Sequence, residues 1–478
     1  MLMPPSTFTL SALSQEHLQG TAAFFDSPAS ALTGAARSYR RLLAEYYNLL
    51  IPADASVLEI GCGDGELLAH LRASRKTGID LSAAQLARAR ARLPDATFLQ
   101  QSGEALDLPG TFDVIIVSDT LNFAADVEQL LSRLHSVATP QTRLLINFHN
   151  NLWHPLFAVA GWLGVQSRQP QSSWLSRHDV DSLLDLSGWA GIKTQARLLW
   201  PVRTPLLAPL CNRLLAPLFP WACCSIFTIA RPRPIPAVPP PSVSVVIPAR
   251  NEAGNIEAAV LRTPAMGSRT ELIFVEGNST DHTWAEIQRV KAAYPERDIK
   301  ILQQTGRGKG DAVRAGYAVA TGDILMILDA DLTMPPEELP KFYSAVASGR
   351  AEFANGCRLV YPMEKQAMQF LNMIANHCFG HAFSWLLGQR VKDTLCGTKV
   401  LSRAHYDRIA ANRAYFGDFD PFGDFDLLFG ADKLNLKIVD IPIRYRERTY
   451  GSTNIHRWSH GWLLLRMVAF AARKLKFV

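Results

Sequence analysis

The chain has 478 residues, of which 48% are apolar and 19% charged, and its formal net charge is +6. This length exceeds what one hydrophobic core usually organises, and the balance of apolar and charged residues excludes a disordered or coiled-coil protein. Ten lysines and arginines stand against two acids from residue 433 onward. The basic charge is therefore local, which argues against a nucleic-acid surface and for an anionic partner near the C-terminus.

The cysteines and the apolar segments both indicate where in the cell the protein is located. Seven cysteines without paired metal-ligand spacing indicate reduced thiols in a cytoplasmic protein rather than a disulfide framework. The first twenty residues lack the basic-then-apolar pattern of a secretory signal. Prolines interrupt the longest apolar runs, so none reaches the ~20 residues that a spanning helix needs. We expect a cytoplasmic protein, with peripheral attachment to the cytoplasmic membrane face left open.

A proline-rich stretch at 231–242, RPRPIPAVPPPS, divides the chain. Prolines fix φ and cannot donate backbone hydrogen bonds, so this stretch predicts a stiff, extended linker. We therefore expect one domain at 1–230, a second at 243–455 and a basic amphipathic helix at 456–478. Each domain is predicted to have an α/β fold.

In the first domain, an apolar run at Val57–Ile60 leads into the turn GCGDG at 61–65 and then into a helical stretch at Glu66–Arg72. Glycines let the backbone turn tightly and bring its N–H groups against a ligand. A second strand at Lys76–Ile79 ends at Asp80, where a carboxylate could bind ribose hydroxyls. This order of strand, loop, helix, strand and acid favours a nucleotide cofactor.

Further strands are expected at Phe112–Val117 and Arg143–Phe148, separated by a helix at Val127–Val137. This alternation predicts a parallel sheet with its ligand at the carboxyl ends of the strands. His149 follows the last strand, where a base could deprotonate an acceptor hydroxyl; a hydrogen-bonded structural histidine is the alternative. The apolar stretch Leu152–Val165 is either a core helix or a wall for a lipid-bearing acceptor.

The segments LEIGCGDGELL, GIDLS and FDVIIVSDTLNF resemble class I S-adenosylmethionine-dependent methyltransferases, over roughly residues 40–230. The resemblance implies a Rossmann-like fold with S-adenosylmethionine as cofactor. It places Glu59, Gly61, Gly63 and Asp80 along that cofactor, with Asp80 on the ribose. Many members carry an acid after the third strand that meets the adenine. This chain reads QSGEAL there, so Ser102 stands where the acid would be and Glu104 lies two residues on.

The second domain begins with a β-branched strand at Val243–Ile247, which ends at PARNE, residues 248–252. A helix from Asn255 and a strand at Glu271–Val275 follow, and the strand ends in EGNSTD. The next strand, Asp323–Leu328, delivers two aspartates.

These aspartates, Asp329 and Asp331, are one residue apart at a strand end and project into one site. Two such carboxylates can hold a divalent cation that bridges two phosphates and neutralises a diphosphate leaving group. Lys309, in the glycine-rich turn GRGKG, strengthens the interpretation because it adds a cation for the same phosphates.

These segments resemble family 2 inverting glycosyltransferases of the GT-A nucleotide-diphospho-sugar transferase fold, over about residues 243–455. Among them the resemblance is to polyprenyl-phosphate sugar synthases of the dolichol-phosphate mannose synthase kind. It implies a nucleotide-diphosphate sugar as donor and Mg²⁺ or Mn²⁺ as cofactor. The base and ribose would be framed by Pro248, Arg250, Glu252 and Glu276. Lys309 would approach the diphosphate, with Asp329 and Asp331 on the metal.

Later motifs of the same family are matched as well. DTLCGTK would place Asp393 at the acceptor, DFDLL carries Asp426 as a catalytic acid, and RTYGS carries Arg448 as a clamp on donor phosphates. Each of these acids could instead be a surface or capping residue. The chain departs from the family at residues 276–277. The family usually has two acids there, whereas this chain has Glu276 followed by Gly277, so the family's preference for a nucleotide base in the donor cannot be transferred to this chain.

The C-terminal segment from Arg457 carries Trp458, Trp462, Leu465 and Val468 at helical spacing among basic residues. This composition suits a helix in the membrane interface, with cations on anionic lipid. A terminal helix docked on its own domain is the alternative.

We therefore expect a bifunctional enzyme. Its second domain would transfer a sugar, with inversion and metal dependence, to a lipid (polyprenyl) phosphate, and its first domain would transfer a methyl group from S-adenosylmethionine. Two rivals stay open: a soluble saccharide or metabolite as the sugar acceptor, and a first domain that is a non-catalytic binding module. No nucleic-acid partner is expected.

Overall fold

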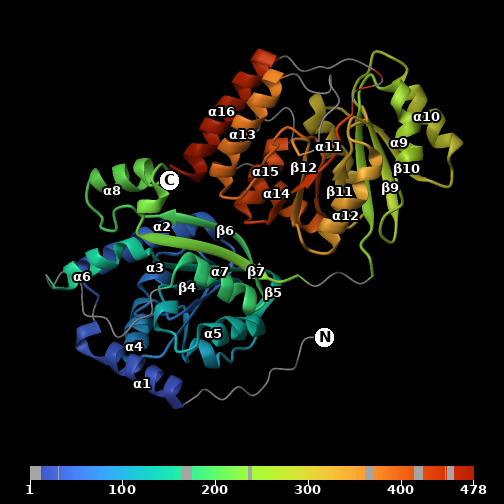
Figure 1. Ribbon diagram of the computed structural model, residues 1–478. Helices are drawn as coiled ribbons and strands as arrows, with labels where there is room; N and C mark the ends of the chain where they lie inside the picture. The colour runs from blue at the N-terminus through green and yellow to red at the C-terminus, as the bar shows by residue number, and fades with distance from the viewer. Residues whose placement is uncertain are drawn as a thin grey trace. The chain divides into compact units, whose positions relative to one another are not determined.

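The computed structural model describes residues 12–30, 32–162, 175–234, 239–360, 370–413, 424–446, 448, 450 and 457–477. The chain forms two compact units, Met1–Arg233 with Lys476–Val478 and Pro234–Leu475 (Figure 1). Each unit has its own sheet and its own core.

The first unit is built on a seven-stranded sheet in the order β3-β2-β1-β4-β5-β7-β6. Its strands are β1 (Ser56–Ile60), β2 (Arg75–Asp80), β3 (Thr97–Gln100), β4 (Phe112–Ser118), β5 (Ala138–His149), β6 (Trp189–Arg197) and β7 (Ser225–Pro232). The first five strands are mutually parallel, as expected from the sequence. Strands β6 and β7 are antiparallel additions that the expected parallel sheet did not include. Strand β7 also takes up Arg231 and Pro232, the first two residues of the expected linker.

Helices cover both faces of this sheet. They are α1 (Ala12–Asp26), α2 (Gly34–Leu50), α3 (Glu66–His70), α4 (Ala83–Arg92), α5 (Val127–Arg133), α6 (His154–Trp162), α7 (Arg177–Leu186) and α8 (Leu207–Pro209). Alternation along β1 assigns the faces, since Val57 packs in one apolar cluster with α2, α3 and α4. Leu58 and Ile60 pack in the other cluster, with α5 and α7. Both faces being buried explains the nearly continuous apolar strands.

The second unit holds another seven-stranded sheet, in the order β10-β9-β8-β11-β13-β12-β14. Its strands are β8 (Val243–Ala249), β9 (Thr270–Glu276), β10 (Asp298–Gln303), β11 (Ile324–Ile327), β12 (Phe353–Cys357), β13 (Lys399–Ser402) and β14 (Ile438–Pro442). Its helices are α9 (Ile256–Arg262), α10 (Thr283–Ala293), α11 (Gly308–Val319), α12 (Leu339–Ala347), α13 (Phe370–Leu387), α14 (Arg403–Ala411), α15 (Asp424–Lys433) and α16 (Arg457–Leu475). Strand β13 is antiparallel to β11 and β12, so the fold is mixed.

Glu271 fixes the amino ends of three of these strands. The side chain is fully buried on β9 and accepts hydrogen bonds from Ser244 of β8, from Thr321 Oγ1 at 3.0 Å and from the Gly322 backbone at 3.2 Å. Lys300 Nζ of β10 lies 2.7 Å away. Burial raises the pKa of Glu271, but the bonds from Lys300, Ser244 and Thr321 outweigh it and lower that pKa to about 2. A buried carboxylate with this many donors sets the register of the strands whose opposite ends carry the site.

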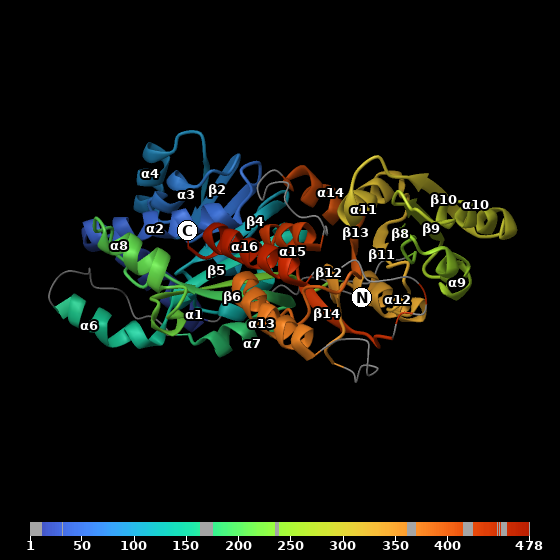
Figure 2. The ribbon, with the colours of Figure 1, turned by 90° about the horizontal axis from the view of Figure 1, so that it is seen from above.

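The C-terminal helix packs on its own unit. Helices α13 and α16 contact each other and lie side by side in both ribbon views (Figures 1 and 2). Met467 and Ala471 of α16 are buried, whereas Leu465 is exposed. The described part of α16 therefore matches the docked alternative; the side chains of Trp458 and Trp462 lie outside the described residues. Within the described ranges, no helix combines the length and the hydropathy that crossing a bilayer requires.

Candidate functional site

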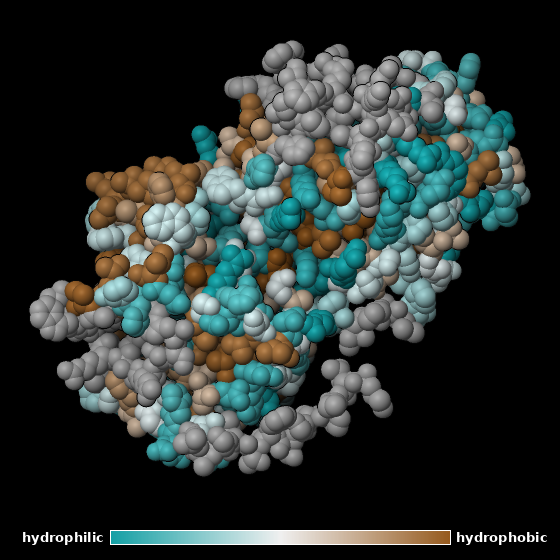
Figure 3. All heavy atoms as spheres, viewed as in Figure 1, coloured by the Kyte–Doolittle hydropathy of each residue, from teal (hydrophilic) through white to brown (hydrophobic). Residues whose placement is uncertain are grey.

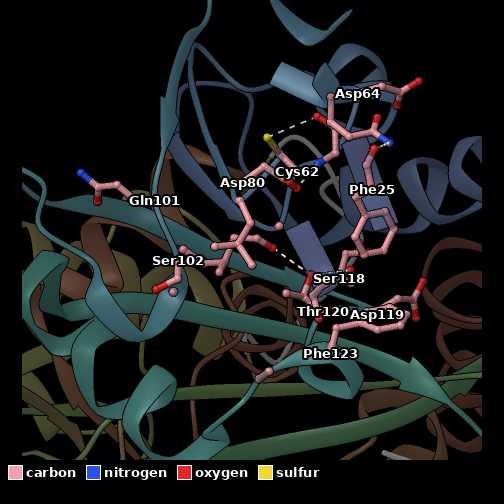
Figure 4. Close-up of a pocket in the computed structure, with 18 of the residues that line it drawn as sticks. Phe25, Cys62, Asp64, Asp80, Gln101, Ser102, Ser118, Asp119, Thr120 and Phe123 are labelled. Carbon is pink, nitrogen blue, oxygen red and sulfur yellow. Dashed lines mark hydrogen bonds between the residues drawn. The ribbon is translucent and has the colours of Figure 1, made fainter. Parts of the chain in front are cut away.

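The first unit has a cavity at the carboxyl ends of β1, β2 and β4, as expected for a parallel sheet (Figure 4). It encloses about 900 Å³, including its opening to solvent. Its wall contains five of the six cofactor residues that the sequence nominated: Gly61, Gly63, Asp80, Ser102 and Glu104.

Two glycines shape the turn after β1. Gly61 has φ +69° and Gly63 has φ +53°, a region that residues with a Cβ rarely adopt. A Cβ on Gly61 would also overlap Thr120, whose hydroxyl donates to the Ile60 carbonyl at 2.9 Å. A Cβ on Gly63 would meet no atom, so that glycine leaves open space at the cavity.

Asp80 is tied to this turn at the end of β2. Its carboxylate accepts hydrogen bonds from the backbone N–H of Gly63 at 2.8 Å and of Ser82 at 2.9 Å. Burial raises the pKa of Asp80, although these two bonds oppose the rise. The structure thus brings Gly61, Gly63 and Asp80 together around one cavity.

Glu59 differs from the other nominated residues because it does not line the cavity. It is fully buried on β1, and neither carboxyl oxygen has a hydrogen-bond partner among the described residues. Burial raises the pKa of Glu59 to about 8, even though Arg40 lowers it. Arg40, on α2, does line the cavity and was missed by sequence reasoning. The pair Arg40–Arg41 in an amphipathic helix gives no signal that one of them faces a ligand.

Ser102 and Glu104 both lie in the cavity wall after β3. Ser102 caps a short turn by accepting from Ala105 N at 3.1 Å, and Glu104 Oε1 accepts from Ala125 N at 2.9 Å. Glu104 is 2% exposed, so its carboxylate is shielded from water. It lies at the position where a purine could be bound.

His149 stands at the end of β5, beside the cavity but outside its wall. Its Nε2 lies 3.8 Å from Asp119 Oδ1, and its Nδ1 lies 3.9 Å from Cys224 Sγ. Asp119 does line the cavity and also accepts a hydrogen bond from Asn147 Nδ2 at 2.8 Å. Asp119 was missed because an acid in the segment SDTL after a strand has no distinctive spacing.

Helix α1 closes the cavity from outside the expected motifs. Leu18, Thr21 and Phe25 line the wall, and Asp26 accepts hydrogen bonds from Ser82 Oγ at 2.6 Å and Ala84 N at 3.0 Å. These bonds attach the end of α1 to the start of α4. The N-terminal helix therefore forms part of the binding site.

In the second unit, Asp329 follows β11 and pairs with Lys309 of α11. Lys309 Nζ lies 2.6 Å from Asp329 Oδ1. Gly397 lies directly against this pair, because a Cβ at that position would overlap both Asp329 Oδ2 and Lys309 Nζ. The glycine of the DTLCGTK motif is thus explained by close approach rather than by backbone conformation.

Asp331 is held by a second cation, Arg448. Arg448 NH2 lies 2.6 Å from Asp331 Oδ2, and its NH1 lies 3.0 Å from Glu252 Oε1. Thr333 donates to Asp331 Oδ1 from its hydroxyl at 2.8 Å. Burial raises the pKa of Glu252, although Arg448 and Asn255 oppose the rise. Three residues separated by up to 196 positions therefore meet in one charged cluster.

The loops after β8 and β9 form the rest of this edge. Glu276 is buried and accepts from the Ser279 backbone, whereas Pro248 is half-buried and Arg250 is exposed. The position of the missing second acid, Gly277, is crowded. A Cβ there would lie 3.2 Å from both Arg250 Cβ and Gln304 Nε2.

These carboxylates suit a divalent metal in chemical type but form a small ligand set. Among the described residues, no group of three or more His, Cys, Asp or Glu side chains is arranged to hold a metal ion. Asp329 and Asp331 offer hard oxygen ligands with 33% and 16% of their side chains exposed. A metal here would need the remaining ligands from a bound diphosphate or from water.

Two nominated catalytic acids are placed differently from the expectation. Asp393 has no exposed surface, and both of its oxygens accept from Arg358, at 2.7 and 2.8 Å. Burial raises the pKa of Asp393, but Arg358 outweighs it and the pKa is lowered. Asp393 therefore does not face an acceptor here, because an ion pair has drawn it into the interior.

Asp426, on α15, accepts from Arg413 Nε at 2.7 Å. The small pocket that it lines contains none of the donor-site residues named above, so its expected catalytic role is not supported by its position. The side chain of Asp424 and residues Gly451 and Ser452 lie outside the described residues.

Comparison with known proteins assigns both units. Residues 33–194 match the family model described as a methyltransferase domain, and residues 244–413 match glycosyl transferase family 2. The chain joins a methyltransferase domain to a family 2 glycosyltransferase domain. Both domains are therefore of enzyme families, and the fold classes expected from the sequence are confirmed.

The curated relatives match the glycosyltransferase domain. A dolichol-phosphate mannosyltransferase from Pyrococcus furiosus is 36% identical over 121 residues, which cover 25% of this chain and 33% of that protein. An undecaprenyl-phosphate 4-deoxy-4-formamido-L-arabinose transferase from Pectobacterium carotovorum is 38% identical over 113 residues, covering 23% and 34%. The matched region is thus about a third of the length of these relatives. Among solved structures, an S-adenosylmethionine-dependent methyltransferase from Thermotoga maritima is similar at 18% identity and a TM-score of 0.32, covering 41% of this chain and 90% of that chain.

The buried Glu59 of the methyltransferase domain predicts an unusual pH dependence of stability. Its pKa is about 8 in the folded chain against an ordinary value of 4.5, so the folded state holds a proton that the unfolded state releases. Stability is therefore full below about pH 4.5 and falls as the pH rises to about 8, by on the order of 4 kcal/mol. Glu59→Gln should remove this loss, giving a higher Tm than wild type at about pH 8 and an equal Tm at about pH 5. Scanning calorimetry measures both, with exposed Glu128→Gln as control, and equal profiles would contradict the assignment.

The Asp393–Arg358 pair of the glycosyltransferase domain predicts a structural defect when it is broken. Asp393→Asn should lower the free energy of unfolding by about 3–5 kcal/mol, because Arg358 is left buried without its counter-charge. The double variant Asp393→Asn/Arg358→Gln should be less destabilised than the sum of the single variants, as urea unfolding would show. Loss of turnover at unchanged stability in Asp393→Asn would restore the acceptor role.

Proposed function

We propose that the glycosyltransferase domain transfers a sugar, with inversion, from a nucleotide-diphosphate sugar to a polyprenyl phosphate. The methyltransferase domain would transfer a methyl group from S-adenosylmethionine to the same glycan or lipid intermediate. The protein would act at the cytoplasmic face of a membrane as a peripheral enzyme. Because the matched region is a third of the length of the relatives, these substrates are proposals for this chain.

The observation that carries the proposal is the alternation of charge at the carboxyl edge of the second sheet. Lys309 pairs with Asp329, and Arg448 joins Asp331 to Glu252. Lys309 and Arg448 are suited to bind the oxygens of a donor diphosphate, for which Arg offers paired donors. Asp329 and Asp331 would hold Mg²⁺ or Mn²⁺. When bound, such an ion neutralises the charge that develops on a departing nucleoside diphosphate.

The burial of Asp393 in an ion pair with Arg358 favours a phosphate over a hydroxyl as the sugar acceptor. A hydroxyl must lose its proton during attack, whereas a phosphate monoester is already ionised at neutral pH. Asp393 was the acid nominated for the acceptor side, and its two oxygens are engaged by Arg358. The names of the relatives agree, since both act on a polyprenyl phosphate by their printed names. A soluble saccharide acceptor remains the second candidate.

The methyltransferase cavity supports cofactor binding by this chain's own residues. The turn at Gly61 and Gly63 presents backbone to the cavity, and Asp80 is held in position for ribose hydroxyls. Glu59 lies fully buried on β1 behind this wall. S-adenosylmethionine fits this donor set, and it would supply an activated methyl group.

His149 is the residue that we assign to the acceptor side of methyl transfer. Its Nε2 lies 3.8 Å from Asp119 Oδ1, so the carboxylate can orient the ring and stabilise a proton taken from the acceptor. Tyr39 lies against the same ring, with centroids 5.6 Å apart. The acceptor itself is assigned only as a hydroxyl on the glycan or lipid.

Sugar transfer is tested by extraction. With a labelled nucleotide sugar, polyprenyl phosphate and Mn²⁺, the wild type should form a butanol-extractable product, and Asp331→Asn should reduce its rate at least about 100-fold. The exposed Asp407→Asn on α14 is the matched control and should retain activity. Product in the aqueous phase with a saccharide acceptor, and none in butanol, would favour the soluble alternative.

Methyl transfer is tested with His149→Gln. This variant should lose about 100-fold or more in turnover while its affinity for S-adenosylmethionine, measured by calorimetry, stays within about twofold of wild type. Unchanged turnover would reject the base role. Calorimetric silence in the wild-type protein would instead support a non-catalytic binding module.

A further inference from the structure

The methyltransferase domain carries an exposed apolar surface that its cofactor site does not use. It lies on the segment between β6 and β7, which includes α8 and a π-helical turn at Leu210–Leu215. Figure 3 shows brown, apolar side chains gathered over α8. Exposed members are Leu206 (87%), Leu207 (41%), Leu210 (48%), Leu214 (49%), Leu218 (56%), Phe219 (46%) and Trp221 (69%). We call this set the apolar patch, and a patch of this kind usually marks an interaction site.

Helix α6 extends the patch toward the acceptor side of the methyl site. Leu156 and Val159 of α6, and Leu152 in the short turn before it, are 54–60% exposed. Hydrogen bonds join the two segments: Asn150 Nδ2 donates to the Trp221 carbonyl at 2.9 Å, and Trp153 Nε1 donates to the Ala222 carbonyl at 2.9 Å. Asn150 follows His149 directly, so the apolar surface begins beside the proposed base.

The charged side chains of the segment that carries the patch are all basic. The sequence has no Asp or Glu between Asp185 and Glu252, a span that contains the whole β6–β7 segment. Arg203 and Arg213 in this segment are exposed, and with Arg72 they line a groove that also includes Pro205 and Pro209 of the same segment. Glu45 lines the groove too and pairs with Arg203 at 3.4 Å. Cations at the border of an apolar surface, with tryptophan beside them, match anionic lipid headgroups over acyl chains.

The backbone of the β6–β7 segment holds its leucine side chains at the protein surface. Leu206 has φ +62°, an unfavourable conformation for a residue with a Cβ, and it is the most exposed large apolar residue of the described chain. Pro209 and Pro217 divide the segment, so it cannot form one continuous helix. It can therefore lie in a membrane interface but not cross a bilayer.

We propose that the apolar patch docks the methyltransferase domain on a membrane with anionic headgroups, so that a lipid-borne acceptor reaches His149 from the bilayer. A symmetric contact with a second copy is less suited, because it would bring two surfaces bordered by exposed arginines together. The proposal goes beyond the proposed function, which assigns no membrane surface to this domain. It does not depend on the identity of the sugar or of its acceptor.

The test uses the full-length protein and vesicles of phosphatidylcholine containing about one third phosphatidylglycerol. Leu206→Ser/Leu210→Ser/Leu214→Ser should reduce the fraction that co-sediments with vesicles at least about tenfold. The matched control, Leu186→Ser/Leu261→Ser, changes leucines that are 70% and 61% exposed elsewhere, and it should bind like wild type. Affinity for S-adenosylmethionine, which should be equal in all three proteins, shows that the fold is intact.

A second variant tests the charge. Arg203→Gln/Arg213→Gln should weaken binding several-fold at low salt and flatten its salt dependence, because two lipid-facing cations are lost. Light scattering coupled to gel filtration gives the oligomeric state of each protein without lipid. Wild-type binding by the triple leucine variant would overturn the proposal. So would a dimer that this variant converts to a monomer, since the patch would then be a self-interface.

Discussion

A carboxylate removed from water must find a compensating partner, and this constraint organises both domains. Glu271 finds Lys300 and several N–H and O–H donors, and it thereby fixes strands at the edge opposite the donor site. Asp331 finds Arg448 from far along the chain. Glu59 finds no hydrogen-bond donor, so burial instead raises its pKa to about 8. Glu59 lies on β1, whose carboxyl end leads into the methyltransferase cavity.

Parallel strands explain why two different chemistries are built in the same way. Their carboxyl ends meet at one edge, and the loops that leave this edge can carry glycines, acids and cations into a common space. In the methyltransferase domain the close approach is made by Gly61, which leaves no room for a side chain next to Thr120. In the glycosyltransferase domain it is made by Gly397, against the Asp329–Lys309 pair. Both glycines are required by neighbours that are distant in sequence.

The methyltransferase domain also has an exposed apolar surface, which is separate from the two sites. The β6–β7 segment holds its leucines in water, lacks acidic residues and adjoins the end of β5 where His149 lies. The described part of α16, by contrast, buries Met467 and Ala471 against its own domain. Apolar exposure beside arginines is the basis of the lipid contact that we propose for the methyltransferase domain, whereas the lipid contact expected for the C-terminal helix stays a prediction. A lipid acceptor for methyl transfer and one for sugar transfer would then meet the same membrane.

The sequence by itself determined the two fold classes and located seven of the fourteen described strands, because apolar runs followed by glycines and acids depend on local chemistry alone. It also nominated Asp80, Asp329, Asp331 and Arg448, which the structure brings into two sites. The tertiary structure decided which charged side chains lie at a site and which are engaged elsewhere. Only packing shows that Asp393 is sequestered by Arg358 rather than turned toward an acceptor. Only the fold places Arg40 in a cavity wall, since the partners of a charged side chain come from segments that no local pattern connects.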